Sequence, residues 1–412
     1  MALLIAGIDV HKRVLMVAVA DASLDEGDRE FQFRRFGTSA GELKHLAAWL
    51  GELGVREVVM ESTAQYWKPV WLALEGQFTQ HLAQAWSNRA PKGRKTDFKD
   101  AQRLVRRQMA GELTLSFVPE AEQRHMRSLT RRRVQLIRDR VRLQNQLEAL
   151  LEEMRIKLSS VISDLLGASG MRILWAIADG ETDPEKLAAL GDQRLKSTRQ
   201  QLQDALLSSP PPILLRLLRQ LLEQVEFVDR QMEQLQAWIA EQMQGWQDAV
   251  ARLAEIPGIR LLAAQQILAE SGPTVAAFPS AAQFASWMGA CPGREESAGV
   301  NRSGRCPKGN PFLRRTLCQA AQAAVRTQNS RFQKVFRRLL PKLGYSKAIW
   351  AIVRRMAELI WKLLRTGERY RELGSPTNPQ ALKRRIQRFT KELRDAGYSV
   401  QITPAASGDA RA

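Results

Sequence analysis

The first 118 residues alternate short apolar runs with polar turns, a pattern typical of strands and of the helices between them. Residues 3–10 (LLIAGIDV) and 14–21 (VLMVAVAD) flank a polar turn, HKR, and predict a β-hairpin. Residues 31–38 (FQFRRFGT) predict a third strand. Residues 56–61 (REVVME) predict a buried strand, and residues 81–86 (HLAQAW) predict another.

Helix signals separate the later strands of this region. A capping box at Ser39 and Glu42 predicts the start of one helix, and Ser62 or Thr63 is expected to cap the next. A third helix follows a polar loop. A hairpin followed by strands that alternate with helices predicts a mixed sheet. This order of elements along the chain is that of a ribonuclease H-like fold.

Residues 119–245 carry a different pattern, in which apolar residues recur every seven positions along charged helices. Two such stretches flank a less regular middle that contains three consecutive prolines. The spacing predicts an antiparallel coiled coil or a dimerising arm. The repeating positions are Leu129, Leu136, Leu143, Leu147, Leu150 and Met154 in the first stretch, and Leu218, Leu221, Val225, Val228, Met232, Leu235 and Ile239 in the second.

Residues 246–372 predict a compact, mostly helical domain with one irregular insertion, residues 291–310. Residues 253–272 are typical of a helix-hairpin-helix with Pro257 and Gly258 in the turn, a motif that offers backbone amides to a phosphate. The remainder is a polar, basic tail. One helix with an apolar face is expected in this tail, residues 373–412, at Leu382, Ile386, Phe389 and Leu393.

The net charge of the chain limits the classes of molecule that it is expected to bind. The chain of 412 residues has 62 Lys and Arg against 43 Asp and Glu, a formal net charge of +19, which favours a polyanion such as nucleic acid. No apolar run approaches the roughly 20 residues that span a bilayer, so no membrane role is expected. Three cysteines without CxxC spacing favour neither zinc nor disulfides, and a cytoplasmic protein, associated with the nucleoid when bound, is expected.

Four acidic residues, Asp9, Glu61, Asp97 and Asp100, stand at the ends of predicted elements. Each alone is equally well explained by a turn, a solvated strand end or the charge preference of a helix N-terminus. Asp97 and Asp100 share a helix face, and acids are disfavoured in strands such as that of Asp9. Together they favour a site in which divalent cations hold the attacking and leaving oxygens of a phosphoryl transfer.

The helix over residues 124–142 is unusually basic. Acids are sparse until Glu148, so salt bridges are not expected to absorb its charge, and phosphate contact is favoured over a merely solvated face. Aromatic residues are nearly absent, which favours backbone or duplex contact over base stacking. The arginines are Arg124, Arg127, Arg131, Arg132, Arg133, Arg138, Arg140 and Arg142.

The insertion at 291–310 holds two serines, Ser297 and Ser303, among glycines and cations. A serine hydroxyl beside cations has the means to attack a phosphodiester, because the cations stabilise the developing charge. The residues alone favour a phosphate-binding loop without chemistry, since no histidine base is nearby. The surrounding cations are Arg294, Arg302, Arg305 and Lys308.

The ordered set of motifs is more specific than any one of them. GIDVHK, MESTAQYW, KTDFKDAQRL, IPGI, WMGACPGREESAG and GNPFLRR follow one another along nearly the whole chain. In this order they resemble the Piv-type DEDD transposases of bacterial insertion sequences, the bridge-RNA-guided recombinases. The resemblance implies an α/β RuvC-like domain over 1–118, a helical coiled-coil region over 119–245, a mostly α-helical transposase domain over 246–372 and a basic tail.

The resemblance also implies a chemistry. The four acids would bind Mg²⁺, and Ser297 would be the covalent nucleophile; because the chain reads Ser-Ala-Gly there where the family has Ser-Gly, Ser303 is the alternative. A noncoding guide RNA from the element would pair with donor and target DNA, and the protein would act as a homodimer or homotetramer. The alternative reading of the residues is a metal-dependent, structure-specific nuclease of the Holliday-junction-resolvase type.

Overall fold

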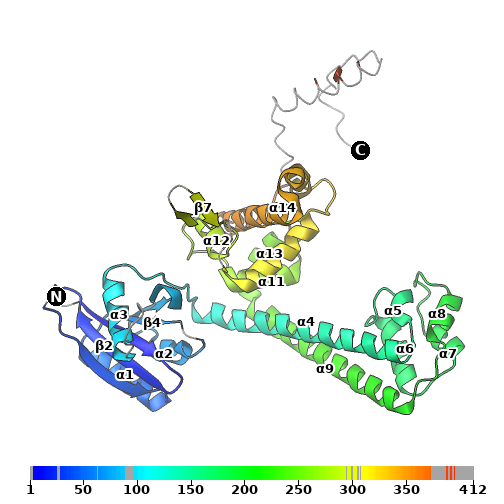
Figure 1. Cartoon of the computed structure of the whole chain (residues 1–412), viewed down its shortest axis with the longest axis horizontal. Coiled ribbons are helices and arrows are strands. Elements are labelled where there is room, and N and C mark those ends of the chain that lie inside the picture. Colours follow the sequence, from blue (N-terminus) through cyan, green and yellow to red (C-terminus); the bar gives the residue numbers. More distant parts are fainter. Residues whose placement is uncertain are drawn as a thin grey trace. The chain divides into compact units, whose positions relative to one another are not determined.

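The computed structural model consists of two compact units, residues 1–120 and 121–412, which are described separately (Figure 1). None of the described helices is long and apolar enough to cross a membrane. The structure describes residues 3–25, 28–62, 64–88, 97–293, 295–297, 300–303, 306, 308–372, 387, 390, 391 and 394.

The first unit is built on a five-stranded mixed sheet. Three strands form an antiparallel meander and two more run parallel to the first, in the order β3-β2-β1-β4-β5. The predicted mixed sheet is therefore confirmed. The strands are β1 (Leu4–Val10), β2 (Val14–Asp21), β3 (Gln32–Gly37), β4 (Glu57–Glu61) and β5 (Thr79–Ala83).

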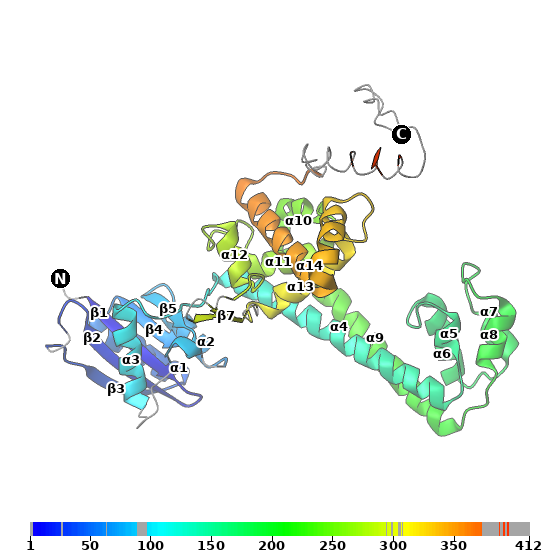
Figure 2. The ribbon, with the colours of Figure 1, turned by 45° about the horizontal axis from the view of Figure 1, so that its top comes forward.

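Helices cover both faces of this sheet (Figure 2). Apolar side chains of α1 and α2 pack on one face and those of α3 pack on the other, because the strands alternate buried residues between the two faces. These elements are α1 (Ala40–Glu52), α2 (Trp67–Leu74), the short 3₁₀ helix η1 (Ala85–Asn88) and α3 (Asp97–Met109).

The cap predictions are partly wrong. The Ser39 hydroxyl accepts from the backbone N–H of Glu42 as predicted, but the Glu42 carboxylate accepts from Gly37 instead of closing the box on Ser39. Helix α2 begins after Tyr66 without a side-chain cap, so Ser62 does not cap it. The strand predicted over 81–86 ends at residue 83, and a 3₁₀ turn takes its last residues.

The second unit is dominated by two long helices, α4 (Ala121–Glu153) and α9 (Pro212–Gln242), which lie side by side (Figures 1 and 2). Arg140 of α4 contacts Asp229 of α9. Arg133, which lies earlier in α4, contacts Gln236, which lies later in α9, so the two helices run antiparallel. Four short helices with their own apolar core lie at one end of this pair. They are α5 (Leu158–Val161), α6 (Ala168–Ala178), α7 (Pro184–Ala189) and α8 (Arg199–Leu206).

The rest of the second unit is a helical cluster carrying a short β-hairpin. Its predicted helix-hairpin-helix is present as α10 and α11, and the turn requires Gly258: φ is 85°, and a Cβ would lie 2.1 Å from the carbonyl oxygen of Ala320. The predicted tail helix lies outside the described residues, apart from four positions. The elements are η2 (Gln244–Trp246), α10 (Gln247–Ala254), α11 (Leu261–Ser271), α12 (Ala281–Trp287), β6 (Glu295–Ser297), β7 (Val300–Ser303), α13 (Pro311–Ala324) and α14 (Arg331–Thr366), which is kinked at Gly344.

Candidate active site

Asp9 is the last residue but one of β1, and Glu61 is the last residue of the neighbouring parallel strand β4. Ile8 of β1 lies opposite Met60 of β4 in the register, so the next residue of each strand is one of the two acids. Alternation sends both acids toward the face that α3 covers, where Val59 already packs with side chains of α3. The strand ends thus place two carboxylates together, as the sequence predicted.

Gly7 brings the third acid to this place. A Cβ on Gly7 would lie 2.3 Å from the carbonyl oxygen of Ala101, so α3 approaches β1 at a distance that only glycine permits. The buried Asp100 stands in the first turn of α3, one residue before that contact. The sequence analysis did not single out Gly7, although a glycine inside an apolar strand signals a close backbone approach.

Asp9 is the electrostatic centre of this cluster. Its side chain is buried, and burial is the main reason why its pKa is raised above the ordinary value. The charge of His11 and its hydrogen bond oppose that rise, whereas the charges of Asp100 and Glu61 reinforce it. The carboxylates of Asp100 and Glu61 therefore lie close enough to Asp9 to disfavour its charged form.

Each of these carboxylates also has a partner that the sequence analysis missed. His11 Nε2 lies 3.0 Å from a carboxylate oxygen of Asp9, and Asn88 donates to Glu61 at 2.9 Å. Arg103, one turn along α3, forms an ion pair with Asp100. These partners fix the side chains, yet no group of three metal-type ligands converges on one point among the described residues.

The donor set nevertheless has the chemistry of a site for a hard divalent cation. Carboxylate oxygens are the ligands such ions prefer, and a cation between mutually repelling carboxylates would relieve the electrostatic strain on Asp9. Asp97 is the first residue of α3, and its side chain lies outside the described part of the structure. Its predicted role as a ligand remains a prediction.

The serine-containing insertion was predicted to be irregular, and that prediction is wrong for its centre. Strands β6 and β7 form an antiparallel hairpin with a bulge at Glu295 and Glu296. Ser297 pairs with Val300 beside the turn, whereas Ser303 pairs with Glu295 at the other end of the ladder. Strands this short have too few positions to show alternation, so no pattern in the sequence predicted them.

The cations predicted around the serines are only partly described. Lys308 is exposed at the foot of the hairpin, and the backbone of Arg302 belongs to β7. Arg294 and Arg305 lie outside the described residues. Their predicted contact with phosphate remains a prediction.

The base of the hairpin is tightly packed. A Cβ on Gly309 would lie 2.2 Å from the carbonyl oxygen of Met288, so the returning chain crosses the end of α12 in direct backbone contact. The next residue, Asn310, caps α13 by accepting from two backbone N–H groups. Its amide also donates to the carboxylate of Glu270 at 2.8 Å, and Arg314 donates to the carbonyl of Gly289.

Glu270 is the centre of a buried ion network that connects three helices. Its side chain is fully buried in α11, and Arg131 of α4 donates to both of its carboxylate oxygens, at 2.8 and 2.7 Å. Arg127 lies 3.4 Å from the same carboxylate. Burial, more than the opposing pull of Glu270, lowers the pKa of Arg127 to about 10, so it stays charged at neutral pH.

This network corrects the expectation that salt bridges cannot absorb the charge of the basic helix. Arg142 pairs with Asp139 of its own helix, but the other partners come from distant segments: Glu270 for two arginines and Asp229 for Arg140. Arg133 is buried as well, with a pKa lowered to about 10 by burial, and it donates to Gln236 and Gln265. The long-range partners of a helix cannot be read from its own sequence.

Other arginines of α4 face solvent. Arg132 and Arg138 are exposed, and Arg138 lines a cavity of about 430 Å³ with Arg142 and Arg315. Arg124 is half-buried. The predicted contact of α4 with phosphate remains a prediction, and the arginines exposed for it are Arg132, Arg138 and Arg142, the last of which pairs with Asp139.

Known proteins resemble this chain in both units. Residues 6–156 match a family of DEDD transposases of the IS110 type, and residues 250–337 match the transposase IS116/IS110/IS902 family. A probable family 20 transposase of Pseudomonas aeruginosa is 26% identical over 76% of this chain and 85% of its own length. The transposase for insertion sequence element IS1111A of Coxiella burnetii is 25% identical over 89% of this chain and 91% of its own.

Proposed function

The chain belongs to the IS110 family of DEDD transposases, and we propose that it inserts and excises its own insertion sequence through a covalent serine–DNA intermediate. As a transposase it acts on DNA, and its family implies dependence on a divalent metal in general. The observation that carries the proposal is the coexistence of the carboxylate cluster at Asp9 with a serine-containing hairpin in the second unit.

The first unit supports a RuvC-like catalytic domain. Its sheet order, β3-β2-β1-β4-β5, is that expected of a ribonuclease H-like fold, and Asp9, Glu61 and Asp100 gather where β1, β4 and the start of α3 meet. Asp97 would complete the set. A bound Mg²⁺ would supply Lewis-acid stabilisation of the phosphoryl oxygens. The chain's own part is to hold the carboxylates through His11, Asn88 and Arg103.

The second unit supports the nucleophile. In the proposed step, the hydroxyl oxygen of Ser297 attacks the phosphorus of a DNA phosphodiester. The bond from phosphorus to one DNA oxygen breaks, that oxygen leaves with a proton, and the serine loses its own. The number of phosphoester bonds is unchanged, so a later attack by a DNA hydroxyl can release the serine and rejoin the strands.

A guide RNA is the remaining part of the proposal. Members of the family resembled here use a structured noncoding RNA from the element, and the exposed arginines Arg132, Arg138 and Arg142 offer α4 a surface for a phosphate backbone. We further propose a homodimer or homotetramer in which catalytic parts of different subunits combine. Protein made together with the DNA flanking its gene is expected to copurify with one discrete noncoding RNA.

The test of the proposal is a search for the serine–DNA adduct. Wild type, Ser297→Ala and Ser303→Ala are each incubated with labelled DNA and magnesium and run on a denaturing gel. We expect an adduct with wild type and Ser303→Ala and none with Ser297→Ala. An adduct lost only in Ser303→Ala would assign the nucleophile to Ser303. Cleavage by wild type with no adduct would instead favour metal-dependent hydrolysis of the junction-resolvase type.

A further inference from the structure

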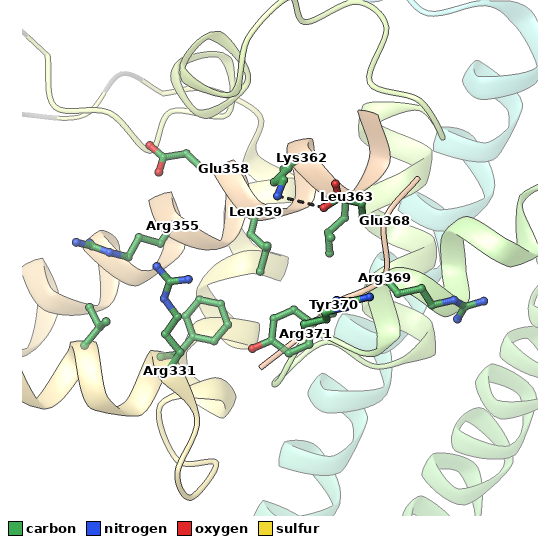
Figure 3. Close-up of a pocket in the computed structure, with 12 residues that line it drawn as sticks. Arg331, Arg355, Glu358, Leu359, Lys362, Leu363, Glu368, Arg369, Tyr370 and Arg371 are labelled. Carbon is green, nitrogen blue, oxygen red and sulfur yellow. Dashed lines mark ion pairs between the residues drawn. The ribbon is translucent and has the colours of Figure 1, made fainter. Parts of the chain in front are cut away.

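Two adjoining cavities follow α14 away from the serine hairpin. The first cavity, of about 650 Å³, is lined at one end by Pro292, which precedes the hairpin, and by Cys306, which follows it. It continues along α14 past Lys347. The other, of about 840 Å³, continues toward the C-terminal end of α14 (Figure 3). Both are lined by Arg355 and Glu358, so together they form one groove, which we call the α14 groove.

The walls of the α14 groove are basic. Its carboxylates are already paired, Glu358 with Arg354 at 2.9 Å and Glu368 with Lys362 at 3.1 Å. Within the described part of the chain, the side chains of Lys347 and Arg331 make no ion pair with a carboxylate. Arg355 donates there only to a backbone carbonyl of its own helix. Three cations thus remain available to an anionic ligand.

The groove also has apolar and aromatic surface. Leu359 and Leu363 of α14 and the ring of Tyr370 line the larger cavity (Figure 3), and Trp350 lines the smaller one. Apolar rings beside cations are the combination that binds single-stranded nucleic acid, since bases stack on the rings and phosphates meet the cations. A duplex keeps its bases stacked inside and offers only phosphates to such a groove.

We propose that the α14 groove binds a single-stranded DNA segment that continues from the phosphate attacked by the serine. The inference rests on the proposed function, which places that phosphate at Ser297, in the hairpin whose flanking residues Pro292 and Cys306 line the start of the groove. From Lys347 to Lys362 the helix rises about 22 Å, the length of about six nucleotides stacked at 3.4 Å. The groove therefore holds the strand next to the cut, where a recombinase must keep the broken end from diffusing away.

The experiment measures oligonucleotide binding by fluorescence anisotropy as salt is varied. The full-length protein carries Ser297→Ala, so that no covalent adduct contributes to the signal. Lys347→Ala/Arg355→Ala removes two groove cations, and the matched control Arg337→Ala/Arg365→Ala removes two exposed cations of the same helix that line neither cavity. The probes are single-stranded DNA, single-stranded RNA of the same sequence, and duplex DNA.

For single-stranded DNA, the groove variant is expected to bind more weakly and to lower the slope of log affinity against log salt by about 1.4, or about 0.7 for each lost phosphate contact. The control variant should match the parent. Equal effects of the two double variants would overturn the proposal, as would an effect on RNA alone or on duplex DNA to the same extent. Because the serine is absent throughout, this result is independent of the adduct test.

Discussion

Asp9 and Glu61 are positioned by the strands of a sheet, whereas Asn310, which follows the serine hairpin in the chain, belongs to a buried ion network around Glu270. In the first region, strand register and a glycine contact bring like charges together, and their repulsion helps to raise the pKa of Asp9. In the second, Glu270 is matched by two arginines, and its charge is satisfied before any ligand arrives.

The two regions therefore differ in how their charged side chains affect the stability of the fold. Carboxylates close enough to raise the pKa of one of them reduce stability until a cation or a proton joins them, which is a mark of a functional site. A buried charge with good partners stabilises only while every partner is present, because each one left alone would be buried and unpaired. Substitutions in the two regions should therefore act in opposite directions on stability.

The largest expected effect is that of Asp9→Asn on activity. Losing a ligand charge should cost more than the roughly 10- to 100-fold that removal of an outer partner costs, so recombination should fall below detection in an excision assay. Nucleic-acid binding should persist, since the shape is nearly unchanged. Asp100→Asn should behave alike. Full activity of both variants would remove these carboxylates from the mechanism.

Stability should respond to Asp9→Asn in the opposite sense from activity. The raised pKa of Asp9 means that the folded state binds its proton more tightly than the unfolded chain does. The ionised carboxylate therefore costs stability above the raised pKa, and that cost disappears as pH falls through the window down to the ordinary value. Thermal melts should show the Asn variant more stable than wild type at neutral pH, with the gain vanishing in acid.

Glu270→Gln should have the next largest effect, this time on stability. It would leave the buried Arg127 and the half-exposed Arg131 without their counter-charge, and a buried charge left unpaired typically costs about 3–5 kcal/mol of unfolding free energy. The matched control is Asp229→Asn, whose ion pair with Arg140 is about a third exposed and should cost about 0–1 kcal/mol. Urea denaturation measures both. Equal losses of unfolding free energy would show that the Glu270 network stabilises the fold no more than the partly exposed pair does.

The same variant tests whether Glu270 positions the hairpin. Its amide in place of the carboxylate weakens the contact with Asn310, which caps α13 where the hairpin segment ends. Adduct formation, measured where the variant is still folded, should fall while binding of duplex DNA is kept. Unchanged adduct yield would limit Glu270 to a structural role.

A smaller effect is expected from Gly7→Ala. The added Cβ would collide with the backbone of Ala101, so α3 must shift and carry Asp100 with it, at a cost of about 1–3 kcal/mol. Gly51→Ala in α1 is the control, because nothing lies within 4 Å of its Cβ position and alanine favours a helix. Thermal melts and the excision assay should both separate the two variants, and identical behaviour would contradict the close packing of α3 on β1.

The smallest effect concerns the exposed arginines of α4. Arg132→Ala/Arg138→Ala should leave stability unchanged and reduce the salt dependence of RNA binding by about one unit of slope for each arginine. Arg194→Ala/Arg216→Ala, which removes two exposed cations elsewhere in the second unit, should change neither. A titration at several salt concentrations is the measurement. No difference between the two double variants would argue against a phosphate surface at these arginines.

Much of the local architecture was predictable from the sequence. The apolar runs 3–10 and 14–21, separated by a polar turn, predicted β1 and β2, and the heptad repeats predicted the two long helices, because both patterns depend only on neighbours along the chain. The short hairpin that contains Ser297 was missed, because its strands are too short to show a period, and the side-chain cap expected for α2 at Ser62 was wrong, because the helix begins after Tyr66.

What the sequence by itself determined is the identity and order of the chemical groups: acids at strand ends, serines among cations, and an excess of arginine. Only the tertiary structure decided which of these groups contact one another. Gly7 allows α3 to pack closely against the sheet, which places Asp100 near Asp9. Glu270 pairs with Arg127 and Arg131, which lie more than a hundred residues earlier in the chain. Contacts between segments so far apart depend on how whole elements pack, and no local pattern of residues records them.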